Sequence, residues 1–201
     1  GLTLLAFLVA AIAMGWFGQL PPIEELENPT TQLASEIYAD DGSVLGKYYL
    51  QNRSNAHYEE LSPQLINALI ATEDIRFYDH SGIDNSRLFT IVIYNLIGKQ
   101  QGGSTISQQL AKNLFPRKKF RSIVDKAVTK LQEWITAALI EQRYTKDEIL
   151  TMYLNTVEFG NNSFGIRSAA KTFFGKTPYQ LNAQESAVLV GVLKAPTLYS
   201  P

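Results

Sequence analysis

The chain beyond residue 61 carries a series of helix-start signals, and these constrain the possible fold most. Three pairs of residues have the spacing of helix caps: Ser62 with Pro63, Thr145 with Glu148, and Asn182 with Glu185. Each pair stands directly before a run that alternates apolar and polar residues with helical periodicity. The predicted helices cover residues 63–73, about 104–115, roughly 120–143, 146–155 and 183–194. We therefore expect a mainly α-helical body.

The N-terminal segment has the composition of a membrane-spanning helix. Its first 18 residues contain no charge and one polar side chain, Thr3, and a spanning helix needs about 20 apolar residues. We predict a transmembrane helix, cut short at its N-terminus, over residues 1–19. Residues 1–46 contain six acids and no Lys, Arg or His, which indicates that this flank lies outside the cytoplasm. The alternative is a cleaved signal peptide.

Residues 20–60 read as a linker between this helix and the main domain. The stretch 21–31, "PPIEELENPTT", is rich in proline and acid and favours extended chain. Residues 35–50 predict a small β-hairpin, because Asp41-Gly42 is a turn dipeptide between β-rich arms. The remainder, 61–201, is long enough for one domain with a core of its own.

Composition excludes several classes of function. The chain has no cysteine, which excludes a disulfide framework and a thiolate metal site. Its two histidines, His57 and His80, argue against a multi-histidine metal cage. The net charge of −1 provides no basic field for nucleic acid, so we expect no nucleic-acid partner.

The predicted helix at 104–115 has a polar face suited to an anionic ligand. At 100° per residue, four side chains fall within an arc of roughly 100°: Thr105, Gln108, Gln109 and Lys112. Three apolar side chains lie opposite: Ile106, Leu110 and Leu114. A solvated face would give the same pattern, but one hydroxyl, two amides and one ammonium fit a polar, anionic ligand better. The preceding Gly102-Gly103 allows close backbone approach, and helix N-terminal amides favour phosphate.

The helix at 120–143 leaves two readings open. Its apolar stripe consists of Ile123, Val124, Ala127, Leu131, Trp134, Ile135 and Ala138. Glu133 lies away from this stripe, with Lys126 and Lys130 as neighbours on the polar face. One reading is a surface pair of Lys130 and Glu133 worth a few tenths of a kcal/mol. The other is a second functional carboxylate that faces Glu73 across a cleft.

The stretch 71–84, "ATEDIRFYDHSGID", places two acids at the end of an apolar helix. Acids are unfavourable at a helix C-terminus, so Glu73 and Asp74 indicate a function there. Glu73 is the candidate general base or acid. His80 is better explained as a structural histidine that fixes the loop by hydrogen bonds.

Five stretches together resemble the motifs of the peptidoglycan glycosyltransferases, glycosyltransferase family 51, in order and spacing. They are "ATEDIRFYDHSGID", "GGSTISQQLAKNLF", "KLQEW", "KDEILTMYLNTVEFG" and "GIRSAAKTFFGK". The resemblance covers about residues 60–201. The apolar N-terminus with the hairpin looks like the start of a bifunctional class A penicillin-binding protein, with a monofunctional transglycosylase as the alternative. The "SAAK" run inside the last motif matches the serine–x–x–lysine pattern of penicillin-reactive enzymes by coincidence.

The resemblance implies a fold, a reaction and a set of site residues. The fold is a lysozyme-like α domain with two lobes. The reaction joins lipid II to a growing glycan strand by a β-1,4 linkage, with inversion and release of undecaprenyl diphosphate. By motif position Glu73 is the general base, and Glu133 is the second catalytic acid near the donor diphosphate. The positions that match substrate contacts are Asp74, Phe77, His80, Gly103, Ser104, Thr105, Gln108, Gln109, Lys112 and Lys130.

The same resemblance implies a divalent cation, magnesium or manganese, with Glu133 as a ligand. It places the protein in the bacterial cytoplasmic membrane as a single-pass protein whose catalytic domain is extracytoplasmic. Implied partners are lipid II, the glycan strand, membrane lipid, and proteins of cell-wall synthesis or division. One position departs from the family pattern, because Thr129 stands where an arginine is common. Lys126, one turn earlier, is the candidate substitute.

The sequence also bears on how the chain contacts lipid and on which other functions it could have. Residues 88–97, "LFTIVIYNLI", are apolar all round, which predicts either a core helix or a membrane-dipping segment. A lysozyme-like hydrolase or lytic transglycosylase would also use a lone carboxylate. A non-catalytic membrane-anchored scaffold is the third possibility, but it leaves Glu73 and the polar arc unexplained.

Overall fold

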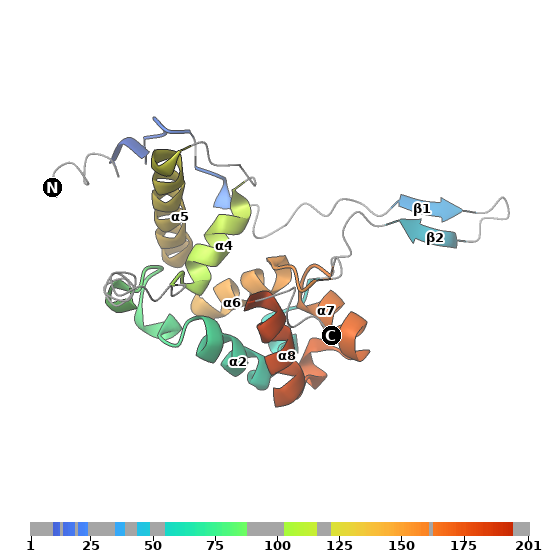
Figure 1. Ribbon diagram of the computed structural model, residues 1–201. Helices are drawn as coiled ribbons and strands as arrows, with labels where there is room; N and C mark the ends of the chain where they lie inside the picture. Colours follow the sequence, from blue (N-terminus) through green and yellow to red (C-terminus); the bar gives the residue numbers. More distant parts are fainter. Residues whose placement is uncertain are drawn as a thin grey trace. The chain divides into compact units, whose positions relative to one another are not determined.

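A computed structural model of the chain is mainly helical (Figure 1). It describes residues 10–12, 14–18, 20–23, 35–38, 44–48, 55–87, 103–115, 122–160 and 163–194. The chain divides into two compact units, Gly1–Glu24 with Ile70–Tyr153 and Glu25–Leu69 with Leu154–Pro201. We call these unit 1 and unit 2 and describe each by itself. The prediction of a mainly α-helical body is confirmed.

The described helices and turns follow in chain order. They are η2 (Tyr58–Glu60), α2 (Pro63–Glu73), η3 (Phe77–Asp79), α4 (Ile106–Leu114), α5 (Ile123–Arg143), α6 (Lys146–Thr156), α7 (Ile166–Phe174), η4 (Pro178–Gln180) and α8 (Ala183–Lys194). Each of the five predicted helices is present within a few residues of its expected bounds. Sequence analysis missed α7, since it is short and follows Gly165, which offers no side chain as a cap.

The predicted caps form as expected. Ser62 Oγ accepts a hydrogen bond from the backbone N–H of Leu65 at 3.1 Å. The backbone N–H of Thr145 donates to Glu148 Oε2 at 2.7 Å, and Glu148 N–H donates back to Thr145 Oγ1. Asn182 and Glu185 exchange the same two bonds at the start of α8. Such a cap contributes about 1 kcal/mol. Because each cap joins residues that are three positions apart, the local sequence is enough to predict where these three helices begin.

In unit 1 the core lies between α4 and α5, which pack side by side (Figure 1). Ile106 and Leu110 of α4 are completely buried, as the predicted apolar face requires. Ala137 and Ile140 meet them from α5 and are also completely buried. Each large aliphatic side chain buried in this way contributes about 1.5–3 kcal/mol.

The predicted apolar stripe of α5 is not its buried face, and that prediction was wrong. Val124 is 70% exposed, Ala127 is exposed, and four further members of the stripe are half-buried: Leu131, Trp134, Ile135 and Ala138. The buried face consists of Gln132, Glu133, Thr136, Ala137 and Ile140. A reason lies in the loop at Gly82, because a Cβ there would come within 2.9 Å of Ala137 O. The loop can approach the backbone of α5 this closely because Gly82 has no side chain.

The N-terminal segment of unit 1 is described only in part. Residues 10–12 are helical, and Gln132 Nε2 donates to Phe17 O at 3.4 Å. Most of the predicted transmembrane helix over 1–19 lies outside the described residues, as does the apolar stretch 88–97. Among the helices that the structure describes, none has the length and apolar character needed to cross a bilayer.

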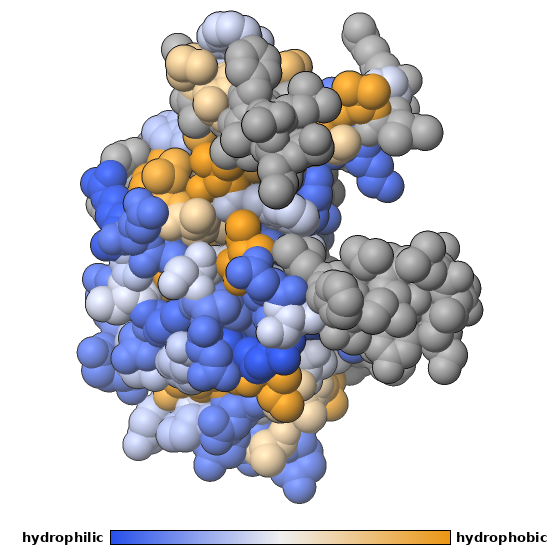
Figure 2. Space-filling model, turned by 90° about the vertical axis from the view of Figure 1, so that its left-hand side faces the viewer, coloured by the Kyte–Doolittle hydropathy of each residue, from blue (hydrophilic) through white to orange (hydrophobic). Residues whose placement is uncertain are grey.

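Several large apolar side chains of unit 1 are exposed, among them Met14, Trp16, Phe17 and Val124. On the face drawn in Figure 2, hydrophilic residues prevail, and apolar residues gather more in the upper half of the view. Exposed apolar surface of this kind is common on folded proteins.

In unit 2 the strands β1 (Ser35–Tyr38) and β2 (Val44–Tyr48) pair antiparallel, with Ser35 opposite Tyr48. The two arms of the predicted hairpin therefore pair. The turn at Asp41-Gly42 lies outside the described residues, so the role of the hairpin as a linker stays a prediction.

The helical part of unit 2 is fixed by one asparagine. Asn155 Oδ1 accepts from the backbone N–H of Ala56, and its Nδ2 donates to Ala56 O, each at 2.9 Å. Gly165 lies directly against Asn155, because a Cβ at this glycine would meet Asn155 O at 2.9 Å. Arg167 forms an ion pair with Glu60. The segment before α2 is thereby held against the end of α6 and the start of α7.

Candidate active site

Glu73 is the last residue of α2, and its carboxylate is half-buried in unit 1. Its Oε2 accepts a hydrogen bond from Gln109 Nε2 at 2.8 Å. Its backbone oxygen accepts one from Arg87 Nη1 at 2.6 Å. The guanidinium of Arg87 supplies the positive charge that a helix C-terminus favours, which offsets the unfavourable position of the acid.

Gln109 is itself held by a second polar group. The hydroxyl of Tyr153 donates to Gln109 Oε1 at 3.0 Å. Burial, and then the negative charge of Glu73, raise the pKa of Tyr153 far above its usual value, so the phenol stays protonated. Sequence reasoning placed Gln109 in the site but missed Tyr153. The signal was present in the fourth motif, where this tyrosine stands among the apolar residues Leu150, Met152 and Leu154 of a helix.

Asp74 connects the first motif to the start of α4. Its Oδ2 accepts from the backbone N–H of Ile106 and from His80 Nε2, each at 3.0 Å. His80 Nδ1 accepts from the backbone N–H of Gly82 at 3.2 Å. Since Nδ1 is an acceptor, the proton of the neutral imidazole lies on Nε2, which donates to Asp74. His80 is thus the loop-fixing histidine that the sequence favoured.

The predicted substrate contacts of the first motif are mostly buried. Asp74 is 1% exposed and Phe77 is completely buried, and the side chain of His80 is nearly so. All three position the loop that follows Glu73. Their direct contact with substrate stays a prediction.

The four residues of the predicted polar arc on α4 have two different roles in the structure. Thr105 is the N-cap of α4, and its side chain and that of Gln108 form a capping box. The hydroxyl of Thr105 also donates to Gly82 O at 2.6 Å, and both side chains are buried. Gln109 is half-buried and Lys112 is exposed. Of the four residues, only Gln109 and Lys112 therefore remain to form the predicted ligand-binding face.

The second carboxylate, Glu133, is 6% exposed and lies on the buried side of α5. Lys130 Nζ donates to Glu133 Oε2 at 2.7 Å and to Ser104 Oγ at 3.0 Å. The ion pair exists, as one reading predicted, but it is not a surface pair because the carboxylate is buried. Removing one partner of a buried pair is far more costly than breaking a surface pair.

The remaining predicted residues lie around this pair. Gly103 and Ser104, directly before α4, and Thr129 on α5 are half-buried. Lys126, the candidate substitute for the arginine missing at Thr129, is exposed one turn before Lys130.

A partly buried ion pair between Lys146 and Glu141 supports the loop that follows Glu73. Sequence reasoning missed this pair. Lys146 Nζ lies 2.7 Å from Glu141 Oε2 and donates to His80 O at 2.6 Å. It also lies 4.3 Å from the centroid of the Phe77 ring, a cation–π contact. The lysine of the fourth motif thereby fixes the residues of the first.

The loop after Glu73 borders a hollow of about 550 Å³, lined by residues that include Arg76, His80 and Asp84. The guanidinium of Arg76 donates two hydrogen bonds to the carboxylate of Asp84, at 2.9 and 3.0 Å. Burial would raise the pKa of Asp84, but the N–H of Arg87 and the guanidinium of Arg76 outweigh it and lower this pKa. The hollow is thus bordered by a rigid, charge-balanced loop.

The two candidate catalytic acids of unit 1, Glu73 and Glu133, therefore have different electrostatic surroundings. Glu73 is paired with a neutral amide and can accept a proton, whereas Glu133 is paired with an ammonium. In the part of the chain that the structure describes, no group of three or more His, Cys, Asp or Glu residues could form a metal cage. A divalent ion at Glu133 would take its other ligands from substrate oxygens, which is a common mode for magnesium.

The comparisons with known proteins identify the family of the chain. Residues 41–201 match the family described as Transglycosylase. The chain is 38% identical to penicillin-binding protein 1A of Escherichia coli over 185 residues, 91% of the chain and 21% of that protein. It is 38% identical to penicillin-binding protein 1A of Neisseria flavescens over 196 residues, 96% of the chain and 24% of that protein. It is 40% identical to penicillin-binding protein 1F of Bacillus subtilis over 171 residues, 84% of the chain and 23% of that protein.

The chain thus spans between a fifth and a quarter of the length of these relatives. The matched range includes all five motifs quoted above, together with Glu73 and Glu133. The resemblance found in the sequence is confirmed: the chain belongs to the transglycosylase family, the glycosyltransferases of the class A penicillin-binding proteins.

Proposed function

We propose that this chain polymerises lipid II, as the glycosyltransferase part of a bifunctional class A penicillin-binding protein. Each cycle would form a β-1,4 linkage with inversion at the donor sugar and release undecaprenyl diphosphate. The observation that carries the proposal is the half-buried carboxylate of Glu73, held by the Gln109 amide. A carboxylate held by a neutral amide in this way is suited to accept a proton.

On the acceptor side, Glu73 would remove the proton of the sugar 4-hydroxyl as that oxygen attacks the donor. Inversion follows from a single displacement, in which a base activates the nucleophile on the face opposite the leaving group. General-base catalysis of this kind contributes about 10²–10⁴-fold in rate.

On the donor side, the leaving group is a diphosphate, which needs charge neutralisation and no proton. Lys130 would supply part of that charge, since its bonds to Glu133 and Ser104 use two of its three N–H donors. Lys112 and Lys126 are exposed and would add to it. A divalent cation, magnesium or manganese, held by Glu133 would further neutralise the charge that develops on the diphosphate.

The proposal extends to the fold class and the setting of the protein. The division into two units supports the lysozyme-like two-lobed domain that the resemblance implies. We place the protein in the bacterial cytoplasmic membrane, anchored through residues 1–19, with the catalytic domain outside the cytoplasm. Membrane lipid, the growing glycan strand, and proteins of cell-wall synthesis or division are its proposed partners.

One assay distinguishes this function from its alternatives. The chain is incubated with fluorescent lipid II in detergent with magnesium, and the products are separated by size. We expect long glycan chains, and none with Glu73→Gln. Cleavage of preformed glycan without polymer would show a hydrolase or lytic transglycosylase, and no change in either substrate would show a non-catalytic scaffold.

A further inference from the structure

The side chain of Tyr153 has no assigned role, yet it is nearly fully buried and directed at the site. We infer that Tyr153 is a positioning residue: through Gln109, it determines which oxygen of Glu73 receives the proton of the acceptor hydroxyl. This inference rests on the proposed function, in which Glu73 is the general base.

Three groups form a continuous chain of hydrogen bonds within unit 1. Tyr153 Oη donates to Gln109 Oε1 at 3.0 Å, and Gln109 Nε2 donates to Glu73 Oε2 at 2.8 Å. An ionised carboxylate can only accept, so the amide must direct its N–H toward Glu73 and its oxygen toward the phenol. A phenol that donates to the amide oxygen also polarises the amide and strengthens its N–H as a donor.

The phenol is needed most at the moment of proton transfer. Once Glu73 is protonated it can itself donate, and an unrestrained amide could rotate to present Oε1 to it. Tyr153 opposes that rotation because its O–H already occupies Oε1. Burial, and then the charge of Glu73, raise the pKa of Tyr153, so this donor is not lost at any working pH.

The consequence is a defined path for the proton. Because Gln109 occupies Oε2, the bond that breaks is the acceptor O–H and the bond that forms is to Glu73 Oε1. The electron pair released on the acceptor oxygen forms the new bond to the anomeric carbon of the donor. The bond from that carbon to the diphosphate oxygen breaks, and its electrons leave with the diphosphate.

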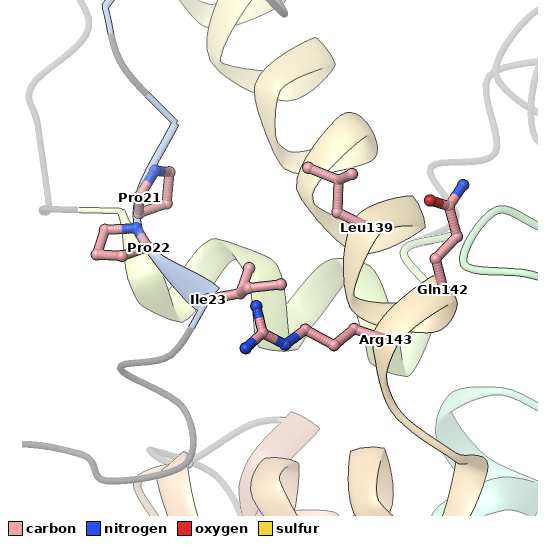
Figure 3. Close-up of a pocket in the computed structure, with 6 residues that line it drawn as sticks. All are labelled: Pro21, Pro22, Ile23, Leu139, Gln142 and Arg143. Carbon is pink, nitrogen blue, oxygen red and sulfur yellow. The ribbon is translucent and has the colours of Figure 1, made fainter.

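Unit 1 also contains a pocket of about 520 Å³ lined by Pro21, Pro22, Ile23, Leu139, Gln142 and Arg143 (Figure 3). It combines apolar walls with one guanidinium, but no observation identifies an occupant.

The first test is Tyr153→Phe, which removes only the hydroxyl. We expect kcat per folded molecule to fall roughly five- to tenfold, the factor that corresponds to one hydrogen bond. KM for lipid II should not change, because Tyr153 is buried and does not touch substrate. Tyr179→Phe is the matched control, since Tyr179 is 65% exposed in unit 2, and it should leave kcat and KM unchanged.

A double-mutant cycle with Gln109→Leu separates positioning from a general loss of stability. Replacing both partners by apolar groups leaves neither the phenol nor the amide unpaired, and the carboxylate of Glu73, which loses its donor, is only half-buried, so the double variant should fold. If Tyr153 acts through Gln109, then Tyr153→Phe lowers kcat in the natural background and has no further effect beside Gln109→Leu. Equal factors in both backgrounds, or a raised KM with kcat kept, would overturn the inference.

The outcomes also distinguish this inference from the proposed function. If the natural chain makes no polymer, or Glu73→Gln retains activity, the proposed function fails. If the natural chain polymerises lipid II, Glu73→Gln is inactive and Tyr153→Phe equals the natural chain, only the positioning role fails.

Discussion

The carboxylate of Asp74 accepts the backbone N–H of Ile106 at 3.0 Å, so a residue next to Glu73 binds the first turn of α4. This contact joins the first and second motifs, since Asp74 and Ile106 lie 32 residues apart in the sequence. It also places a negative charge at a helix N-terminus, where such a charge is favourable. The distance between Glu73 and its partner Gln109 therefore depends on Asp74.

Substituting Asp74 tests whether this contact holds the site. Asp74→Ala leaves the N–H of Ile106 and Nε2 of His80 without their buried acceptor, so we expect a loss of about 2–5 kcal/mol in the free energy of unfolding. Urea unfolding measures it. Asp79→Ala, at an exposed acid of the same loop, is the control and should change stability by less than about 0.5 kcal/mol. Equal effects of the two substitutions would contradict the structural role of Asp74.

Glu73→Gln tests the general base. The amide keeps the size of the side chain but cannot take a proton, so polymerisation of lipid II should fall by about 10²–10⁴-fold. The thermal unfolding midpoint should change little, because Glu73 is only half-buried. A variant that keeps more than half of the natural polymerisation rate would show that Glu73 is not the base.

The acid of α5 should matter more than its lysine partner. Glu133→Gln removes a buried negative charge, whereas the proposed positive charge on the donor side is shared among Lys112, Lys126 and Lys130. We expect a larger loss of kcat for Glu133→Gln than for Lys130→Ala, measured with fluorescent lipid II at saturating magnesium. Lys171→Ala, an exposed cation of α7, serves as the control. The reverse order would assign the main donor-side role to the lysine.

Asp84 gives a pH dependence of stability whose sign is defined. Its pKa is lowered by folding below the ordinary value of 3.8, so the folded state binds the proton less readily than the unfolded state. Its contribution is therefore fully present above pH 3.8 and is lost as pH falls through the lower, folded pKa. Urea unfolding between pH 6 and 2.5 should show a shallower acid loss for Asp84→Asn than for the natural chain. An identical pH profile for the two proteins would contradict this assignment.

Much of the fold could be predicted because its signals are local. The caps at Ser62, Thr145 and Asn182 act on amides two or three residues away, so the sequence contains everything needed to place these helix starts. The apolar face of α4 was also predicted correctly, since Ile106 and Leu110 meet a core that only excludes water. Glu73 was identified for a similar reason, as an acid at an unfavourable helix end.

The site could be predicted only in part. Thr105 and Gln108 lie on the same arc as Gln109 and Lys112, and periodicity cannot show that a capping box uses the first two. Tyr153 was missed because a tyrosine on an apolar helix face is usually core. Its role depends on Gln109, 44 residues away, which no local pattern reveals.

By itself, the sequence determined the helical composition of this protein, the starts of the capped helices, and Glu73 and Glu133 as its candidate catalytic acids. The tertiary structure alone decided which face of α5 is buried and which partner each acid has. Helical periodicity defines faces relative to one another, but it does not specify which face meets the rest of the chain. For α5 that choice depends on Gly82, which lies so close to the α5 backbone that a Cβ there would come within 2.9 Å of Ala137 O. It also depends on Ser104, which binds Lys130 and lies 26 residues from it.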